Sequence, residues 1–257
     1  MLRTAALLAL LLAAPAVAKD TKPRLRTRVA LGPQIVPSYP GADSYSVRPF
    51  LEFSRARGDD VFAFEAPDES FGFPILRDSR FQFGPSLGFE GERTARDVGV
   101  AVPKVGFTVE AGGFAQYHLA PAIRLRGELR KGIGGHKGLI GSISADFVAR
   151  DRDRWLFSLG PRLTLADTRY QRAYFGISPA TAAATGLPAF RTDGGVQAVG
   201  ITAGALRQLN RRWGVTGYAR YDRLVADAAR SPLVRGFGSR GQLSGGVALS
   251  YTLGAPN

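Results

Sequence analysis

The sequence of 257 residues contains no cysteine, one methionine and two histidines. Without cysteine, the chain has no disulfide bond, no thiolate metal site and no cysteine nucleophile. The two histidines, His118 and His136, are too far apart in sequence to suggest a metal-binding cluster. We therefore expect neither a metal ion nor any other cofactor.

Long apolar runs are confined to the N-terminus. Arg3 precedes an apolar stretch over residues 5–14, and Ala16-Val17-Ala18 then supplies small side chains. This order is typical of a secretory signal peptide, which we predict over residues 1–18. The mature chain then covers residues 19–257 as one domain. None of its segments approaches the ~18 apolar residues of a membrane-spanning helix.

Acidic residues are scarcer than basic ones, 21 against 34, which gives a formal net charge of +13. Such a charge is typical of proteins that bind nucleic acid. The predicted export and the even spread of the basic residues argue against it, so we expect no nucleic acid. Only five of the basic residues are lysine. Because arginine pairs with carboxylates in a two-pronged geometry, we expect most of the arginines to have structural roles.

Apolar and polar residues alternate in many segments of the mature chain. Over residues 139–150, the odd positions are Leu, Gly, Ile, Ala, Phe and Ala, whereas the even positions include Ser, Asp and Arg. A period of two indicates β-strands with one apolar and one polar face. The pattern predicts twelve strands, over residues 24–36, 46–57, 61–66, 70–77, 81–91, 105–118, 122–131, 138–150, 155–167, 196–209, 213–224 and 241–253.

The same alternation occurs in soluble β-sandwiches and in transmembrane β-barrels, so the loops decide between these two classes. Short turns, such as 151–154 and 210–212, alternate with long segments, such as 168–195 and 225–240. Outer-membrane barrels sort their connections in this way, and their strands need ~9–11 residues to cross the bilayer. We therefore predict an all-β fold, a transmembrane antiparallel up-and-down β-barrel of about 12 strands. Its short turns face the periplasm, its long loops face outward, and its wall contacts outer-membrane lipid.

Several motifs in the predicted outer loops are similar to those of a known family. They are Tyr39-Pro40-Gly41, Gly134-Gly135-His136, Tyr174-Phe175-Gly176, Asp227 and Ser231-Pro232. In order and spacing, they resemble the motifs of the MipA/OmpV family over essentially the whole mature chain. The resemblance implies an outer-membrane β-barrel of Gram-negative bacteria. It also implies a non-enzymatic scaffold that brings a lytic transglycosylase together with a murein synthase.

Charged residues at alternate positions of two adjacent predicted strands should face the lumen of the barrel. They are Arg124, Arg126, Glu128, Arg130, Asp146 and Arg150. Pairs between these arginines and carboxylates would fill and stiffen the lumen. A surplus of arginine would instead favour anions in a pore. The alternative to a scaffold is therefore a narrow outer-membrane solute channel with anion preference.

His136 lies between glycines in a predicted tight outer loop. Its imidazole could contact a ligand or lock the loop, or it could bond to local backbone as an ordinary turn residue. Together with Ser231 and Asp227, it supplies the residue types of a hydrolytic triad. A triad also needs its nucleophile within hydrogen-bond reach of its base, which the sequence does not indicate, so we expect no enzyme activity.

Overall fold

The computed structural model describes residues 24–78 and 80–254. The predicted signal peptide, the expected start of the mature chain at Lys19, and Ser79 between the predicted strands over 70–77 and 81–91 lie outside the described residues. Within the described ranges, no helix has the length and apolar character needed to cross a membrane.

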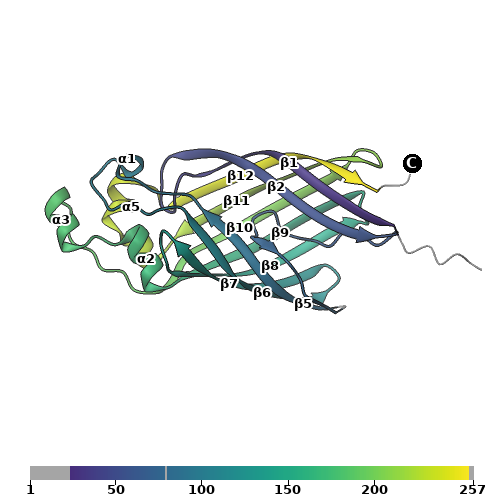
Figure 1. Ribbon diagram of the computed structural model, residues 1–257, viewed down its shortest axis with the longest axis horizontal. Coiled ribbons are helices and arrows are strands. Elements are labelled where there is room, and N and C mark those ends of the chain that lie inside the picture. The colour runs from purple at the N-terminus through teal and green to yellow at the C-terminus, as the bar shows by residue number, and fades with distance from the viewer. Residues whose placement is uncertain (1–23, 79, 255–257) are drawn as a thin grey trace, which may run out of the picture.

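One antiparallel sheet of twelve strands makes up most of the structure (Figure 1). Ten strands are long, namely β1 (Leu25–Pro37), β2 (Tyr45–Arg57), β5 (Phe81–Glu90), β6 (Thr108–Ala120), β7 (Ile123–Gly134), β8 (Leu139–Asp151), β9 (Trp155–Ala166), β10 (Gly195–Gln208), β11 (Trp213–Leu224) and β12 (Gly241–Leu253). Two are short, β3 (Phe71–Gly72) and β4 (Leu76–Arg77). Consecutive strands from β5 to β12 pair as neighbours, and β1 pairs with both β12 and β2, which curls the sheet into a barrel.

The side chains explain why this sheet is a membrane barrel. On β7, Arg124 and Arg126 point inward and are buried, whereas Leu125 and Leu129 on the opposite face are 39% and 56% exposed. Large exposed apolar side chains recur in this way on the outer face of every long strand. A soluble protein rarely exposes so large an apolar surface. The predicted transmembrane β-barrel of about 12 strands is therefore confirmed.

The two ends of the barrel differ as the loop lengths predict. The turns after β6, β8 and β10 are short and lie at the end where the C-terminus is labelled (Figure 1). The opposite end carries five helices, α1 (Ala95–Val98), α2 (Thr168–Phe175), α3 (Pro179–Thr185), α4 (Ala226–Arg230) and α5 (Pro232–Phe237). In outer-membrane barrels the short turns are periplasmic. The helical end is accordingly the outer one, and we call it the outer cap.

The prediction of a strand over residues 61–66 is wrong. This segment has no strand structure, and Phe62 and Ala66 are buried. Residues 61–70 instead pass through the lumen, and we call them the lumen segment. As a wall strand, the segment would end in a turn with Asp68 and Glu69 in the hydrocarbon. Because charged side chains are expensive there, the carboxylates turn inward to arginines.

The predicted strand over 70–77 is interrupted. Only β3 and β4 pair with β5, in the registers Phe71↔Leu87 and Leu76↔Phe83. The backbone N–H of Phe73 also donates to the carbonyl of Pro85 (2.9 Å). The chain between β2 and β5 thus contributes only a short, irregular edge to the wall.

The outer cap has its own apolar cores. Tyr170, Tyr174 and Phe175 of α2 pack with Leu224 and Val234 in one cluster. A second cluster, which joins the first loop to the loops around α1, α3 and α5, consists of Tyr39, Ala42, Val98, Val102, Ile177 and Leu233. The outer loops are therefore packed into one folded unit over the barrel.

Candidate functional site: the lumen and the outer cap

The charged side chains of β7 predicted to face inward, which we call the β7 row, are Arg124, Arg126, Glu128 and Arg130. They lie in the lumen, where ion pairs connect them to neighbouring strands. Arg124 Nη2 lies 2.6 Å from Asp146 Oδ2 on β8. Arg126 pairs with Glu128 on the same face (3.2 Å). Arg130 reaches both Glu128 (2.5 Å) and Glu110 of β6 (2.9 Å). These side chains are buried or mostly buried, so each depends on its partners for stability.

The lumen segment supplies the carboxylates that complete this network. Asp68 pairs with Arg162 of β9 (2.7 Å) and Arg220 of β11 (3.0 Å) and accepts a hydrogen bond from the Thr202 hydroxyl of β10 (2.8 Å). Glu69 forms an ion pair with Arg124. Two adjacent residues thereby connect the segment to four strands of the wall.

Aromatic rings pack against the same guanidinium groups. The guanidinium carbon of Arg126 lies 3.9 Å from the ring centre of Phe114, and that of Arg124 lies 4.5 Å from the ring centre of Phe64. Such contacts stabilise a cation in a dry environment. They also fill the space beside the ion pairs.

Carboxylates slightly outnumber arginines in this network. Its arginines are Arg124, Arg126, Arg130, Arg162 and Arg220, and its carboxylates are Asp68, Glu69, Glu110, Glu128, Asp146 and Asp222. We call this set the lumen ion-pair network. Five arginines face six carboxylates, so the network has no surplus positive charge to attract anions.

Arg150 lies apart from the network, near the periplasmic turn after β8. It pairs with Asp153 (3.2 Å) and donates to the carbonyl of Phe62 (2.9 Å). Asp153 also accepts from the backbone N–H of Phe62 (3.0 Å). Arg150 thus holds the beginning of the lumen segment rather than its centre.

His136 is buried where the lumen meets the outer cap. Its Nε2 lies 3.0 Å from Glu110 Oε1, and its Nδ1 accepts from the backbone N–H of Gly138 (3.0 Å). Since Nδ1 is an acceptor, the proton is on Nε2 and is directed to the carboxylate. The ring centre lies 4.7 Å from that of Tyr170. A Cβ at Gly132 would lie 2.3 Å from the imidazole, so glycine is required there.

The long-loop motif is also buried. Tyr174 and Phe175 are at most 1% exposed, and the Tyr174 carbonyl accepts from Arg93 Nη1 (3.3 Å). Burial raises the pKa of the Tyr174 phenol, and the carboxylates of Glu90 and Glu110 raise it further. The ring is therefore a neutral packing group. Gly176 ends α2, and its N–H bonds to a carbonyl of that helix.

The motifs of the first and last loops lock the outer cap. The Ser231 hydroxyl donates to the Phe175 carbonyl (2.7 Å), and Pro232 begins α5. The Asp227 carboxylate accepts a hydrogen bond from the backbone N–H of Asp193 (2.8 Å). This bond and the neighbouring Arg230 lower the pKa of the Asp227 carboxyl. Gly41 has φ +95°, and its N–H donates to Gln242 (3.0 Å).

Further residues of these motifs have packing roles. Tyr39 belongs to the second apolar cluster, and Pro40 lies beside it in the first loop. Gly134 has φ +98°, and a Cβ at Gly135 would lie 1.9 Å from the Gly106 carbonyl. Ser231, Asp227 and His136 bond to separate partners, so these contacts do not assemble a catalytic triad.

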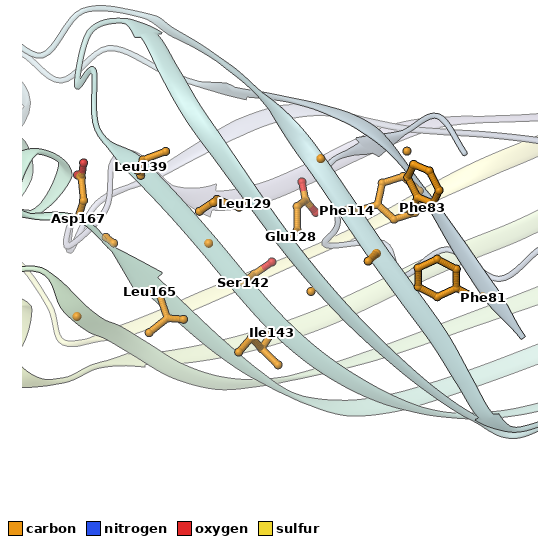
Figure 2. A pocket seen from close by; sticks show the side chains of 17 residues that line it. Phe81, Phe83, Phe114, Glu128, Leu129, Leu139, Ser142, Ile143, Leu165 and Asp167 are labelled. Atoms are coloured by element: carbon orange, nitrogen blue, oxygen red, sulfur yellow. The ribbon is translucent and has the colours of Figure 1, made fainter. Parts of the chain in front are cut away.

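The lipid-facing surface carries a groove of about 860 Å³ (Figure 2). Glycines on the outer face of β6, β7 and β8 form part of its floor, whereas Phe81, Phe83, Leu129, Ile143 and Leu165 form its sides. Figure 2 shows Phe81 and Phe83 toward one end, with Leu139 and Asp167 toward the other. Apolar side chains of this kind are suited to contact with membrane lipid.

Fold, surface and loop arrangement define an outer-membrane β-barrel. The family model described as MltA-interacting protein MipA matches residues 29–253, so the chain belongs to the MipA family. None of the curated proteins compared matches the chain.

Solved outer-membrane structures are similar at low identity. An outer-membrane channel from Pseudomonas putida F1 is 7% identical, with a TM-score of 0.43, over 91% of this chain and 98% of that one. A bacterial polysaccharide outer membrane secretin is 8% identical, with a TM-score of 0.41, over 91% and 100%. The P. putida toluene transporter TodX is 11% identical, with a TM-score of 0.34, over 93% and 91%.

Sequence patterns do not reveal the partners of the β7 row. They place Asp68 and Glu69 in a short connection between strands, and they do not single out Glu110, Arg162 or Arg220. The available signal is the acidic run from Glu65 to Glu69, which contains Pro67 and stands within an arginine-rich chain.

We predict that replacing both carboxylates of the lumen segment opens the lumen. Asp68→Asn with Glu69→Gln leaves buried arginines without partners, which costs about 3–5 kcal/mol per broken buried pair. In planar bilayers, the variant should conduct in discrete steps with anion preference, whereas the parent stays silent. Glu92→Gln, which removes an exposed carboxylate paired with Lys104, is the matched control. A silent double variant with heat-modifiable gel migration would contradict this role.

A second prediction concerns the outer cap. His136→Ala removes the acceptor for Gly138 and the donor to Glu110, so the cap should lose roughly 1–3 kcal/mol of stability. Limited proteolysis should then cut residues 168–194 faster, while gel migration of the barrel stays unchanged. His118→Ala, on β6, is the control. Equal cleavage rates in all three proteins would show that His136 does not lock the loop.

Proposed function

We propose that the protein is a non-enzymatic scaffold that links the outer membrane to murein synthesis and turnover enzymes. The observation that carries this proposal is the lumen segment, which the ion-pair network holds inside the barrel. A barrel filled in this way offers its periplasmic turns, rather than a pore, as a working surface. The name of the family model, MltA-interacting protein, supports a lytic transglycosylase as partner. A murein synthase is proposed as a second partner.

The periplasmic turns form a charged surface of fixed shape. Arg154, whose side chain is 79% exposed, pairs with Asp151 (3.0 Å) in the turn after β8. Arg152 donates from there to the Asp59 carbonyl of the turn after β2 (2.9 Å). The turn after β10 is ordered by Asn210, whose side chain accepts from two backbone N–H groups. Turns held together by such hydrogen bonds and ion pairs lose little conformational entropy on binding, which suits them to a docking surface.

The export step belongs to the same proposal. Residues 1–18 act as the secretory signal peptide, and the mature chain of residues 19–257 forms one barrel domain. Short periplasmic turns then face the murein, while the packed outer cap faces outward.

A solute channel with anion preference remains the alternative. The lumen ion-pair network weighs against it, because its arginines do not outnumber its carboxylates and an anion-selective pore needs surplus positive charge along its path. The two functions predict different results in planar bilayers. The unmodified protein stays silent if it is a scaffold and conducts if it is a channel.

Docking through the turns predicts a charge-dependent interaction. Substituting Arg152, Arg154, Arg211 and Arg212 by Gln should reduce recovery of a lytic transglycosylase in a pull-down by about tenfold, since each lost polar contact weakens binding by a fraction of a kcal/mol to several kcal/mol. Gln at Arg169, Arg172, Arg191 and Arg235 in the outer cap is the matched control and should leave recovery unchanged. Full recovery with the turn variant would refute docking at this surface.

A further inference from the structure

The groove on the lipid-facing surface crosses the wall from β5 to β9, and we call it the wall groove (Figure 2). Its volume of about 860 Å³ lies within the ~300–1,000 Å³ of sites that bind small molecules. It extends from Phe81 and Phe83 at the start of β5 to Leu139 and Asp167 at the outer ends of β8 and β9. One side of the barrel is therefore hollowed, and the hollow leads to the outer end of the wall.

Glycines on three adjacent strands create this hollow. Gly113, Gly127 and Gly141 line the groove from β6, β7 and β8. The register places Leu129 between Gly113 and Gly141, and it places Gly127 opposite Ile143. Glycine weakens the interior of a strand, and it often marks a position that a ligand or another chain approaches closely. The two large side chains therefore stand as walls beside a floor of glycine.

Gly127 lies at the open centre of the floor. A Cβ at this residue would meet no atom of the described residues within 4 Å. Its backbone is not in the left-handed region that favours glycine. Neither packing within the protein nor backbone geometry therefore requires glycine at this position. A larger side chain would occupy the groove without displacing the wall.

Exposed cations surround the outer end of the wall groove. Lys131 of β7 is the direct partner of Leu139 in the antiparallel register, and both side chains are exposed. Lys137 is exposed in the turn between β7 and β8. Arg169 and Arg172 are exposed one helical turn apart on α2. We call these four cations, Lys131, Lys137, Arg169 and Arg172, the basic rim.

The two segments that supply the basic rim touch each other. A Cβ at Gly138 would lie 2.4 Å from the backbone nitrogen of Tyr170 and 2.6 Å from the carboxylate of Asp167. The turn between β7 and β8 is thus in contact with the start of α2. Lys137 and Arg169 are the sequence neighbours of Gly138 and Tyr170, so the contact brings both cations to the same end of the groove.

The protein does not neutralise the charge of the basic rim. Within residues 24–78 and 80–254, none of its four members forms an ion pair. The carboxylate at this end of the groove, Asp167, accepts from the backbone N–H of Tyr170 (2.8 Å) and caps α2. Elsewhere in the outer cap, by contrast, Lys104 pairs with Glu92 (2.6 Å). The rim is therefore suited to an anion that is not part of this chain.

Groove and rim together define the chemistry of the occupant. An apolar groove in the hydrocarbon fits an acyl chain, because a polar group would lose its hydration there. Lysine and arginine at the head-group level fit phosphate, which arginine binds in a two-pronged geometry. A second copy of this chain, docked symmetrically on the groove, would bring two basic rims together at a cost in repulsion. A phosphorylated lipid has both of the required groups.

We propose that the wall groove and the basic rim form one binding site for a phosphorylated lipid of the outer leaflet. Its acyl chain lies over Gly127, between Leu129 and Ile143, and its phosphate contacts the basic rim. The site is separate from the periplasmic turns, so it does not depend on the scaffold role.

Photolabelling of the unmodified protein locates such a lipid. The probe is diphosphoryl lipid A with a diazirine in one acyl chain, in nanodiscs of phosphatidylcholine. Leu243 and Leu249 of β12 match Leu129 and Ile143 in exposure (55% and 50% against 56% and 52%) but lie outside the groove. The groove residues should be labelled about fivefold more strongly, as preferential binding requires. A phosphatidylcholine probe should label all four alike. Equal labelling with the lipid A probe would overturn the proposal.

Filling the groove provides the decisive variant. Gly127→Leu should reduce the retention of diphosphoryl lipid A in native mass spectrometry by about tenfold, because the leucine occupies the space of the acyl chain. Ala219→Leu, at an exposed position of β11 outside the groove, is the matched control and should retain the lipid like the parent. Heat-modifiable gel migration selects the folded barrels. Unchanged retention by folded Gly127→Leu would exclude the groove as the site.

A charge variant tests the phosphate contact. The parent should retain diphosphoryl lipid A about tenfold better than phosphatidylcholine, and Lys131→Gln/Arg169→Gln/Arg172→Gln should lose this preference. Arg223→Gln/Arg235→Gln/Arg240→Gln removes three exposed cations near β11, α5 and β12 and should keep it. An unchanged preference in the first variant, or an equal loss in both, would show that the basic rim does not bind the phosphate.

Discussion

The ion pairs between two adjacent carboxylates, Asp68 and Glu69, and the arginines of the wall determine the rest of this structure. Arg124, Arg126 and Arg162 are at most 6% exposed, and an unpaired cation at such a depth is strongly destabilising. Their own strands supply only part of the required negative charge. The remainder comes from a segment that would otherwise belong to the wall. Pairing the arginines of the lumen therefore takes residues 61–70 out of the barrel wall.

Three features follow from this exchange. The lumen is filled, the edges of β2 and β3 have no strand partner within the described residues, and the periplasmic turns become the accessible charged surface. The outer cap closes the other end through apolar packing and through His136, which joins the β7–β8 loop to Glu110. This arrangement suits a membrane-anchored scaffold better than a conducting pore.

Local patterns predict the long strands well, because alternation depends only on which face of a strand contacts lipid. The last strand, predicted over 241–253, is β12 at Gly241–Leu253. The same alternation misleads for 61–66, since Phe62 and Phe64 would face lipid in a wall strand, whereas in the lumen segment Phe62 is buried and Phe64 packs against Arg124. The partners of Asp68 are 94 and 152 residues away, a relation that no local pattern contains. The contact of His136 with Glu110 is hidden from sequence patterns for the same reason.

Disulfide trapping of the lumen segment tests most directly whether residues 61–70 fill the barrel. A Cβ at Gly204 of β10 would lie 3.2 Å from the side chain of Pro67, and the chain has no other cysteine to interfere. With the segment in the lumen, Pro67→Cys/Gly204→Cys should form an intramolecular disulfide on mild oxidation of the folded, heat-modifiable barrel. If these cysteines stay reduced in the folded barrel, residues 61–70 do not lie in the lumen against β10, and neither the filled lumen nor the scaffold role built on it holds.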